Sequence, residues 1–155
     1  MTVALTSPIT TVRTATQGPE YKTGDRTEFK SGLFVYGYNG AGAVHVKGAP
    51  AWGMSVTVPY GFGKVADIVT SVEKPLGAVV GAVPTLGYGW IFCGGFALAA
   101  DEWVKGDGDC AAGEAIYAVA DTFDTAAAVD DNVLCGTCMV ADTPYITGYF
   151  NFFGG

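Results

Sequence analysis

The feature that most constrains the fold is an uncharged stretch in the middle of the chain. Residues 75–100 contain no Asp, Glu, Lys or Arg, and residues 86–95 (LGYGWIFCGG) are rich in aromatic residues and glycine. Such a stretch belongs in a membrane or in the interior of a folded domain. Two prolines and six glycines interrupt it, which favours strand, turn and strand over a membrane-spanning helix. We therefore expect no membrane span.

The two halves of this stretch are predicted to be strands joined across residues 84–88. Residues 76–83 and 89–93 are apolar and do not alternate with polar residues. A strand with one face in water alternates, whereas a strand covered on both faces does not. The sequence therefore predicts that both strands are buried on both faces, in the core of a barrel or a sandwich.

The composition of the whole chain also favours strands. Its 155 residues are enough for one domain. Glycine, Val, Thr and aromatic residues are frequent, whereas the helix formers Leu, Glu, Lys and Arg are scarce. Short strand-like runs recur about every ten residues, with turn signals between them. We predict an all-β fold: a single small β-barrel or β-sandwich over residues 31–155, preceded by an extended N-terminal arm over residues 1–30.

Several further strands are predicted from β-branched and aromatic runs. Asn39-Gly40 follows the run at residues 32–38 and predicts a two-residue hairpin turn, because both central positions accept a positive φ. Residues 43–47 would then return antiparallel. The other predicted strands are residues 54–58, 113–119, 133–141 and 145–153. Residues 65–72 fit a strand or one short helix, and we favour the strand.

The first 30 residues show no sustained apolar periodicity, and Pro8 and Pro19 interrupt them. Two alternatives remain open: a mobile terminus, or an extended arm that becomes ordered against a neighbouring subunit. Arg13 and Arg26 are the candidate interface residues of this segment. No secretion signal is visible, since the N-terminus lacks a basic region followed by an apolar core.

The net charge of −7 is unevenly distributed. Residues 101–155 hold ten acidic side chains and one basic side chain, whereas residues 1–100 hold five acidic and seven basic ones. An acidic half repels phosphate, so nucleic acid is not an expected partner. The same acidity complements a partner with a basic surface.

Four cysteines raise the question of a metal or redox site: Cys93, Cys110 and the Cys135-Gly-Thr-Cys138 pair. The first two do not form a second CxxC motif, as a zinc site of this type would need. In an extended strand, positions three apart point to opposite faces, so Cys135 and Cys138 should not meet. We expect reduced, structural cysteines and no metal.

No catalytic or cofactor motif emerges from the sequence. Asp107, Asp109 and Glu114 lie in a glycine-rich segment without the EF-hand spacing, which indicates a solvated turn instead of a calcium site. His45 is the only histidine and is predicted to be half exposed on an alternating strand. Walker A, GxGxxG, HExxH and GxSxG motifs are absent. We expect no enzyme activity and no cofactor.

Six segments define an order of features along the chain: residues 34–36 (FVY), 77–83 (GAVVGAV), 86–95 (LGYGWIFCGG), 111–118 (AAGEAIYA), 133–136 (VLCG) and 149–153 (YFNFF). This order resembles the small decoration (cement, or auxiliary head) proteins of tailed bacteriophages. The third segment is similar to the family's G-Y/E-Y-G-W-V strand, and the fourth resembles its A-A-G-D-x-L-Y turn and strand. The likeness covers residues 32–153 and is best from residue 76 onward.

The resemblance implies a β-rich domain, often trimeric, bound to the outer surface of an icosahedral capsid and assembled in the host cytoplasm. It implies no catalysis. The expected function is a virion structural protein that cements or decorates adjacent capsomers, with the major capsid protein and other copies of itself as partners. The candidate core or interface residues are Trp90, Phe92, Tyr88, Trp52, Tyr60, Arg13 and Arg26.

The alternative is a carbohydrate-binding or adhesive β domain displayed on a virion or cell surface. Its binding platform would be exposed Trp52, Tyr60 and Trp103. The first two fall in the glycine-rich stretch 48–63, which we expect to be a long exposed loop. A third possibility, a ligand-binding barrel, fits less well because the predicted interior holds few polar groups.

Overall fold

The computed structural model describes residues 1–53, 60–63, 75–106, 110–119, 121–125, 133–140 and 144–152. The chain is all-β, as predicted, and the described part contains no α-helix. Its strands are β1 (Arg26–Phe29), β2 (Gly32–Asn39), β3 (Pro50–Gly53), β4 (Gly61–Gly63), β5 (Gly77–Val79), β6 (Tyr88–Ala97), β7 (Ala115–Val119), β8 (Thr122–Asp124), β9 (Val133–Val140) and β10 (Thr147–Asn151). A turn of 3-10 helix, η2 (Ala99–Asp101), follows β6. No helix among the described residues is long and apolar enough to cross a membrane.

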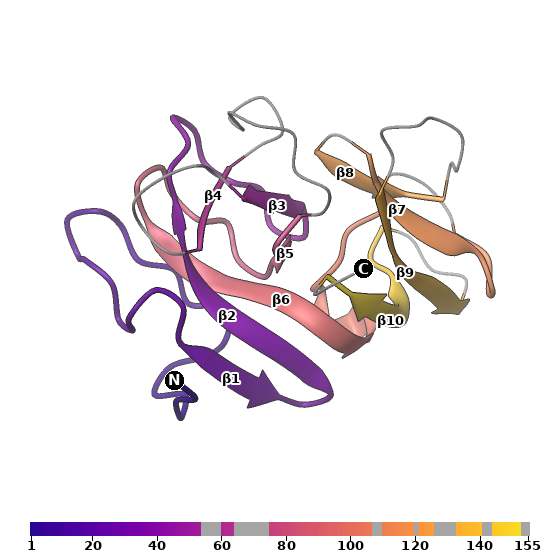
Figure 1. Cartoon of the computed structure of the whole chain (residues 1–155), viewed down its shortest axis with the longest axis horizontal. Helices are drawn as coiled ribbons and strands as arrows, with labels where there is room; N and C mark the ends of the chain where they lie inside the picture. The colour runs from indigo at the N-terminus through magenta and orange to yellow at the C-terminus, as the bar shows by residue number, and fades with distance from the viewer. Residues whose placement is uncertain are drawn as a thin grey trace.

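Five strands close into a barrel (Figure 1). The ring runs β2, β4, β3, β5 and β6, and β6 pairs back to β2 along most of its length. The β2–β4 pair is parallel, and the other four pairs are antiparallel. Of the two predicted architectures, barrel or sandwich, the structure therefore has the barrel.

The central strand β6 is buried on both faces, which confirms the prediction made from its lack of alternation. Ile91 and Cys93 belong to a small apolar cluster with Val35 and Phe62 from the facing strands of the barrel. Trp90 and Phe92 alternate with them and therefore point the other way, into a second and larger cluster. The two clusters form two cores, one on each side of the β2–β6 pair.

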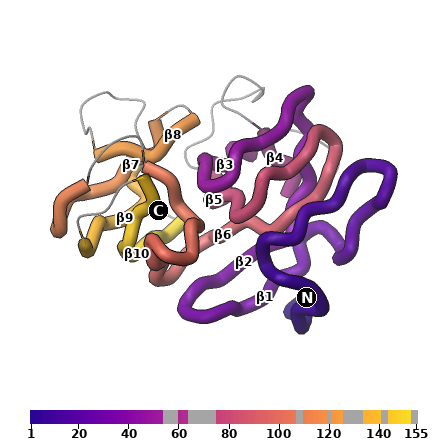
Figure 2. The backbone as a smooth tube through the Cα atoms, turned by 180° about the vertical axis from the view of Figure 1, so that it is seen from behind, coloured from indigo at the N-terminus to yellow at the C-terminus, as the bar shows by residue number. Residues whose placement is uncertain are grey.

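The remaining strands extend the sheet beyond the barrel. β10 pairs with the C-terminal part of β6, and β9, β7 and β8 follow in that order. They form a second lobe beside the barrel, seen from opposite sides in Figures 1 and 2. The inner face of this lobe carries Ile116, Cys138 and Phe150, which belong to the larger core. One continuous apolar core thus joins the two lobes.

Residues 1–30 pack against their own domain. Ile9 is buried, and Tyr21 contacts Tyr36 and Trp90 with ring centroids 5.3 and 5.1 Å away. At the end of the segment, β1 pairs with β2, and Thr2 forms a parallel bridge to Arg26 at the outer edge of β1. The structure therefore places this segment in contact with the barrel of its own chain. Contact with a neighbouring subunit stays a prediction.

The predicted hairpin at Asn39-Gly40 is wrong. β2 ends at Asn39, but its antiparallel neighbours are β1 and β6, and residues 43–47 contribute only a bridge between His45 and Val83. The Asn39 side chain is fully buried, and its Nδ2 donates hydrogen bonds to the carbonyl oxygens of Ala43 and Val83 at 3.0 and 3.1 Å. The Asn39 side chain therefore holds the loop, and Asn39 does not adopt the positive φ that the hairpin turn would need.

Two further predictions, on His45 and on the glycine-rich stretch, are wrong, and others concern residues that the structure does not describe. His45 is buried, not half exposed, because its ring packs edge-on against Phe62 at 5.2 Å and its Nε2 lies 2.8 Å from the carbonyl oxygen of Pro50. The glycine-rich stretch 48–63 contains β3 and β4 instead of one exposed loop. The strands predicted at residues 54–58 and 65–72, and the acidic residues Asp107 and Asp109, lie outside the described residues.

Candidate protein-binding surface

Three of the seven candidate residues are core residues. Trp90, Phe92 and Trp52 are at most 3% exposed. Trp90 lies opposite Tyr36, and Phe92 lies opposite Phe34, across the β2–β6 pair. These side chains stabilise the domain and are not available to a partner.

Tyr88 and Arg13 form one surface pair. Their backbones exchange two hydrogen bonds, from Arg13 N to Tyr88 O at 2.9 Å and from Tyr88 N to Arg13 O at 2.8 Å. The half-buried Tyr88 ring stacks on Tyr36 with centroids 6.3 Å apart. The Arg13 guanidinium donates through Nε to the carbonyl oxygen of Gly18 and through Nη2 to that of Gln17, each at 3.1 Å. Arg13 therefore closes its own turn and holds the N-terminal segment on β6.

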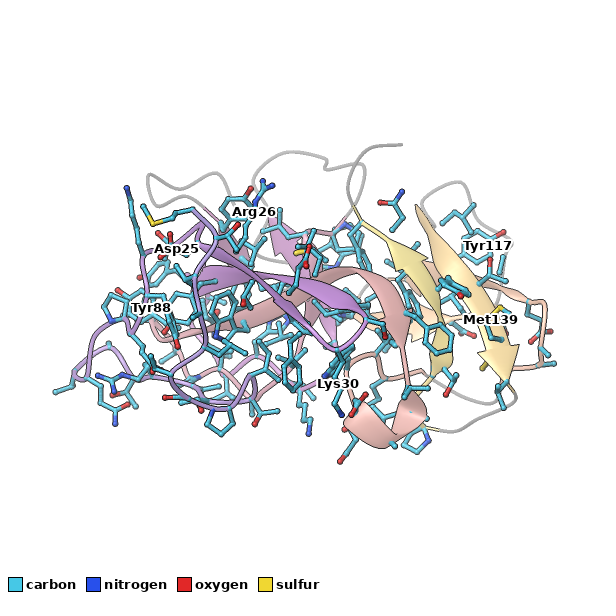
Figure 3. All side chains as sticks on the ribbon, turned by 90° about the horizontal axis from the view of Figure 1, so that it is seen from below. Asp25, Arg26, Lys30, Tyr88, Tyr117 and Met139 are labelled. Carbon is cyan, nitrogen blue, oxygen red and sulfur yellow. A yellow bond between two sulfur atoms is a disulfide. The ribbon has the colours of Figure 1, made fainter. Side chains whose placement is uncertain are left out.

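Arg26 and Tyr60 form the second pair. Arg26 Nη2 donates to Tyr60 Oη at 3.2 Å, and this hydrogen bond raises the pKa of the Arg26 guanidinium. Arg26 lies on β1 next to Asp25, in the other half of the molecule from Tyr117 and Met139 (Figure 3). The structure thus brings the four half-buried or exposed candidates together in two pairs that fasten residues 1–30 to the barrel.

The carbohydrate platform does not form. Trp103 is 1% exposed and packs edge-on against Phe34 at 4.8 Å, and Trp52 is also buried. Tyr60 is the one member of the proposed trio that reaches solvent. Two of the three aromatic rings therefore belong to the core, where a sugar ring cannot stack on them.

A surface that the sequence analysis did not identify lies on the second lobe. Tyr149, Leu134 and Met139 are 57%, 54% and 44% exposed, which is unusual for large apolar side chains on neighbouring strands. They alternate with Cys135, Cys138 and Phe150, which face the core. We call this surface the outer face; it comprises Phe96, Ala115, Tyr117, Leu134, Thr137, Met139 and Tyr149.

The outer face is held by four strands in register. Ala115 on β7 lies opposite Thr137 on β9, Thr137 lies opposite Tyr149 on β10, and Tyr149 lies opposite Phe96 on β6. The rings of Tyr149 and Phe96 are in contact, with centroids 4.8 Å apart. Directly opposing residues of antiparallel strands point to the same side of a sheet. The row therefore presents a mostly apolar surface on a hydrogen-bonded scaffold.

A second row adds an acidic residue at the edge. Tyr117 on β7 lies between Leu134 on β9 and Asp124 on β8. Tyr117 and Met139 lie at the same end of the molecule (Figure 3). Glu114 immediately precedes β7 and is exposed. The outer face is thus mostly apolar, with Asp124 opposite Tyr117 at its β7–β8 side.

Two pockets in the described part of the chain have polar side chains in their lining. The larger, about 490 Å³, lies between the β1–β2 turn and β10, with Lys30, Cys93 and Asn151 among its lining residues. The smaller, about 280 Å³, is lined in part by His45, Lys105 and Asp121. No group of three or more His, Cys, Asp or Glu side chains among the described residues is placed to hold a metal ion.

Two of the four cysteines are oxidised, whereas we expected all four to be reduced. Cys110 and Cys138 form a disulfide, so the prediction that all four are reduced is wrong. Cys93 and Cys135 keep buried thiols, and burial raises the pKa of the Cys93 thiol to about 12. Cys135 and Cys138 both face inward because the β7–β9 register shifts between Ile116 and Tyr117, which breaks the simple alternation.

Comparison of the chain with protein-family models, with curated proteins and with solved structures gave no match.

Proposed function

We propose that this protein is a non-enzymatic virion structural protein of a tailed bacteriophage, which binds the exterior of an icosahedral capsid and cements adjacent capsomers. The observation that carries the proposal is the outer face. Apolar side chains from four strands meet there, and the most exposed of them are Tyr149, Leu134 and Met139. Tyr and Met are enriched in protein–protein interfaces, and a contiguous exposed apolar patch is typical of a binding surface.

The scaffold behind the outer face suits a role in reinforcement. On the strands that carry the outer face, the side chains that point the other way pack into the larger core. Cys138 on β9 is cross-linked to Cys110. Rigid elements lose little conformational entropy when they bind. The outer face can therefore bind a partner tightly without first having to become ordered.

The resemblance of the sequence to the decoration proteins also supports this function. Of the segments that resemble the decoration proteins, residues 111–118, 133–136 and 149–153 include parts of β7, β9 and β10, which carry the outer face. The proposed partners are the major capsid protein and further copies of this chain in a trimer. The proposed location is the outer surface of the capsid.

Co-sedimentation tests the proposal. Purified protein is mixed with expanded capsids that lack it, and the bound fraction is measured over a concentration series. The proposal predicts saturable binding with a fixed number of copies per capsid. Absence of the protein from the capsid pellet at all concentrations would contradict it.

A carbohydrate-binding function has less support, because Trp52 and Trp103 are buried. Binding of the isolated protein to a glycan array, together with no affinity for capsids, would nevertheless replace the proposal with that function.

A further inference from the structure

We infer that Cys110 and Cys138 form a redox latch, which is an open dithiol while the protein is made and assembled in the host cytoplasm and closes to the disulfide after the virion is released. This inference rests on the proposed function, which supplies the two compartments. Cytosolic thiols are kept reduced, whereas disulfides form and persist in oxidising surroundings. The contacts around the two sulfur atoms fit both states.

The fold holds the two cysteines within disulfide reach without help from the sulfur atoms. Their Cα atoms are 6.4 Å apart, inside the range of about 4.4–6.8 Å that disulfides span. Cys138 N donates to the carbonyl oxygen of Glu114 at 2.8 Å, and Gly113 N donates to that of Cys138 at 2.7 Å. These backbone hydrogen bonds fix β9 beside the segment that follows Cys110, so the pair stays in place when the latch is open.

The surroundings of the sulfur atoms also suit two thiols. The carbonyl oxygen of Val140 lies 3.1 Å from Cys138 Sγ and 3.8 Å from Cys110 Sγ. A thiol is a weak hydrogen-bond donor, and a buried thiol stays protonated. Both cysteines are at most 3% exposed, and a buried reduced cysteine packs as a small apolar side chain. Opening the latch therefore neither buries a charge nor removes packing.

Cys93 and Cys135 keep their thiols in the structure. Cys93 belongs to the smaller core, on the other side of the β2–β6 pair from the latch. Cys135 is three residues from Cys138 on β9, and Cα atoms three residues apart in an extended strand are separated by about 10 Å. That separation exceeds the reach of a disulfide. We expect oxidation to form the Cys110–Cys138 disulfide.

Closing the latch needs a two-electron oxidant. Hydrogen peroxide is one, and it is small enough for a buried pair. The first cysteine attacks one peroxide oxygen, the O–O bond breaks, and a sulfenic acid and one water form. The sulfur of the second cysteine then displaces the sulfenic oxygen as a second water, which forms the S–S bond. In total, two thiols and one peroxide give one disulfide and two waters.

The latch closes a loop around one edge of the sheet. The loop from residue 110 to residue 138 contains β7, β8 and part of β9, and β8 ends the strand order of the sheet. Edge elements open locally more readily than central strands. A cross-link removes conformational entropy from the opened loop, which makes local opening less favourable. The closed latch therefore protects the β7–β8 edge in the released virion.

Trapping the thiols tests the two states. The full chain is expressed in a cytosol with intact reducing pathways, the cells are lysed in guanidinium chloride with N-ethylmaleimide, and alkylated cysteines are identified by peptide mass mapping. We expect all four cysteines to be alkylated. After the folded, reduced protein is treated with hydrogen peroxide, we expect alkylation of Cys93 and Cys135 and a disulfide between Cys110 and Cys138. A disulfide already present in the cytosol, or none after peroxide, would overturn the inference.

Hydrogen exchange measures what the latch does. Amides of β7 and β8 should exchange at least about tenfold more slowly in the oxidised protein than in the reduced protein. Peroxide should leave their exchange unchanged in Cys110→Ala/Cys138→Ala. The matched control, Cys93→Ala/Cys135→Ala, keeps the latch and should respond to peroxide like wild type. Equal exchange of these amides in oxidised and reduced wild type would contradict the protective role.

Capsid binding separates the inference from the proposed function. Reduced and oxidised wild type should bind expanded capsids with the same affinity, because assembly takes place with the latch open. If the oxidised form alone binds, or if the thiol measurements fail while both forms bind, the inference is overturned and the proposed function stands. If neither form binds, the proposed function fails, and with it the two compartments that the inference needs.

Discussion

Tyr36 and Trp90 lie directly opposite each other on β2 and β6, with ring centroids 5.1 Å apart in an edge-to-face arrangement. One residue away, Val35 and Ile91 form the next pair, whose side chains lie inside the barrel. The same two strands therefore supply both cores. Tyr21 covers the Tyr36–Trp90 pair from the N-terminal segment, which couples that segment to the centre of the fold.

Trp90→Ala should destabilise the domain by about 3–5 kcal/mol, because it removes a buried indole and leaves a cavity between Tyr21 and Tyr36. Trp90→Phe keeps part of the packing and should cost less. Chemical denaturation followed by tyrosine fluorescence or circular dichroism measures both. A Trp90→Ala protein as stable as wild type that fails only in capsid binding would instead assign Trp90 to an interface.

Gly37→Ala should destabilise the barrel, by about 1–3 kcal/mol. A Cβ at this position would lie 2.6 Å from Ile91 Cδ1 and 3.0 Å from the carbonyl oxygen of Tyr60. Gly42→Ala is the matched control, because a Cβ there meets no atom within 4 Å. Thermal unfolding of the two variants should separate them clearly, and equal melting temperatures would mean that the barrel wall relaxes around the added methyl group.

Removal of the Cys110–Cys138 disulfide should cost about 3–4 kcal/mol by the chain-entropy relation, since the two residues are separated by 28 positions. Dithiothreitol should lower the unfolding midpoint of wild type. The Cys110→Ala/Cys138→Ala variant should have a lower midpoint and should not respond to the reductant. If dithiothreitol lowered the unfolding midpoint of both proteins equally, its effect would not come from the Cys110–Cys138 disulfide.

The Cys93 thiol should make stability fall at high pH. Its pKa is about 12 in the folded protein against an ordinary value of 9.0, because burial disfavours the thiolate. Below pH 9 the thiol is protonated in both states. Between pH 9 and 12 it ionises only in the unfolded state, so this group lowers the free energy of unfolding by up to about 1.4 kcal/mol per pH unit.

Comparison with Cys93→Ala isolates this contribution, because other groups also titrate in that range. The difference in unfolding free energy between wild type and the variant should be constant below pH 9 and should shrink as the pH rises. A difference that stays constant up to pH 11 would show that the Cys93 thiol reaches solvent in the native state.

The burial of β6 was predictable because it follows from local sequence. An apolar run without alternation has no face for water, and the structure places Ile91 in one core and Trp90 in the other. Barrel closure was not predictable in the same way. It depends on the parallel pairing of Tyr38 with Gly61, and no local pattern specifies a contact between such distant segments.

The candidate residues illustrate the same limit. Aromatic and arginine side chains were chosen as core or interface candidates, but a sequence does not say whether Trp52 or Tyr60 reaches solvent. The outer face has a partial signal in the sequence, because Leu134, Thr137 and Met139 are interleaved with Cys135 and Cys138. The register shift between β7 and β9 interrupts the regular period of two, so the pattern is not recognised as an alternating strand. The Cys110–Cys138 pairing had no signal, because spacing alone does not determine connectivity.

The account is tested most directly by the capsid affinity of the Leu134→Ser/Tyr149→Glu variant. Val44→Ser is the control, because Val44 is 53% exposed and lies in the loop after β2, outside the outer face. Both variants should keep the wild-type circular dichroism spectrum, since neither position is buried. We predict that the double variant loses at least about thirtyfold in affinity for expanded capsids while Val44→Ser binds like wild type. Equal binding by the double variant and wild type would contradict the assignment of the outer face as the binding surface.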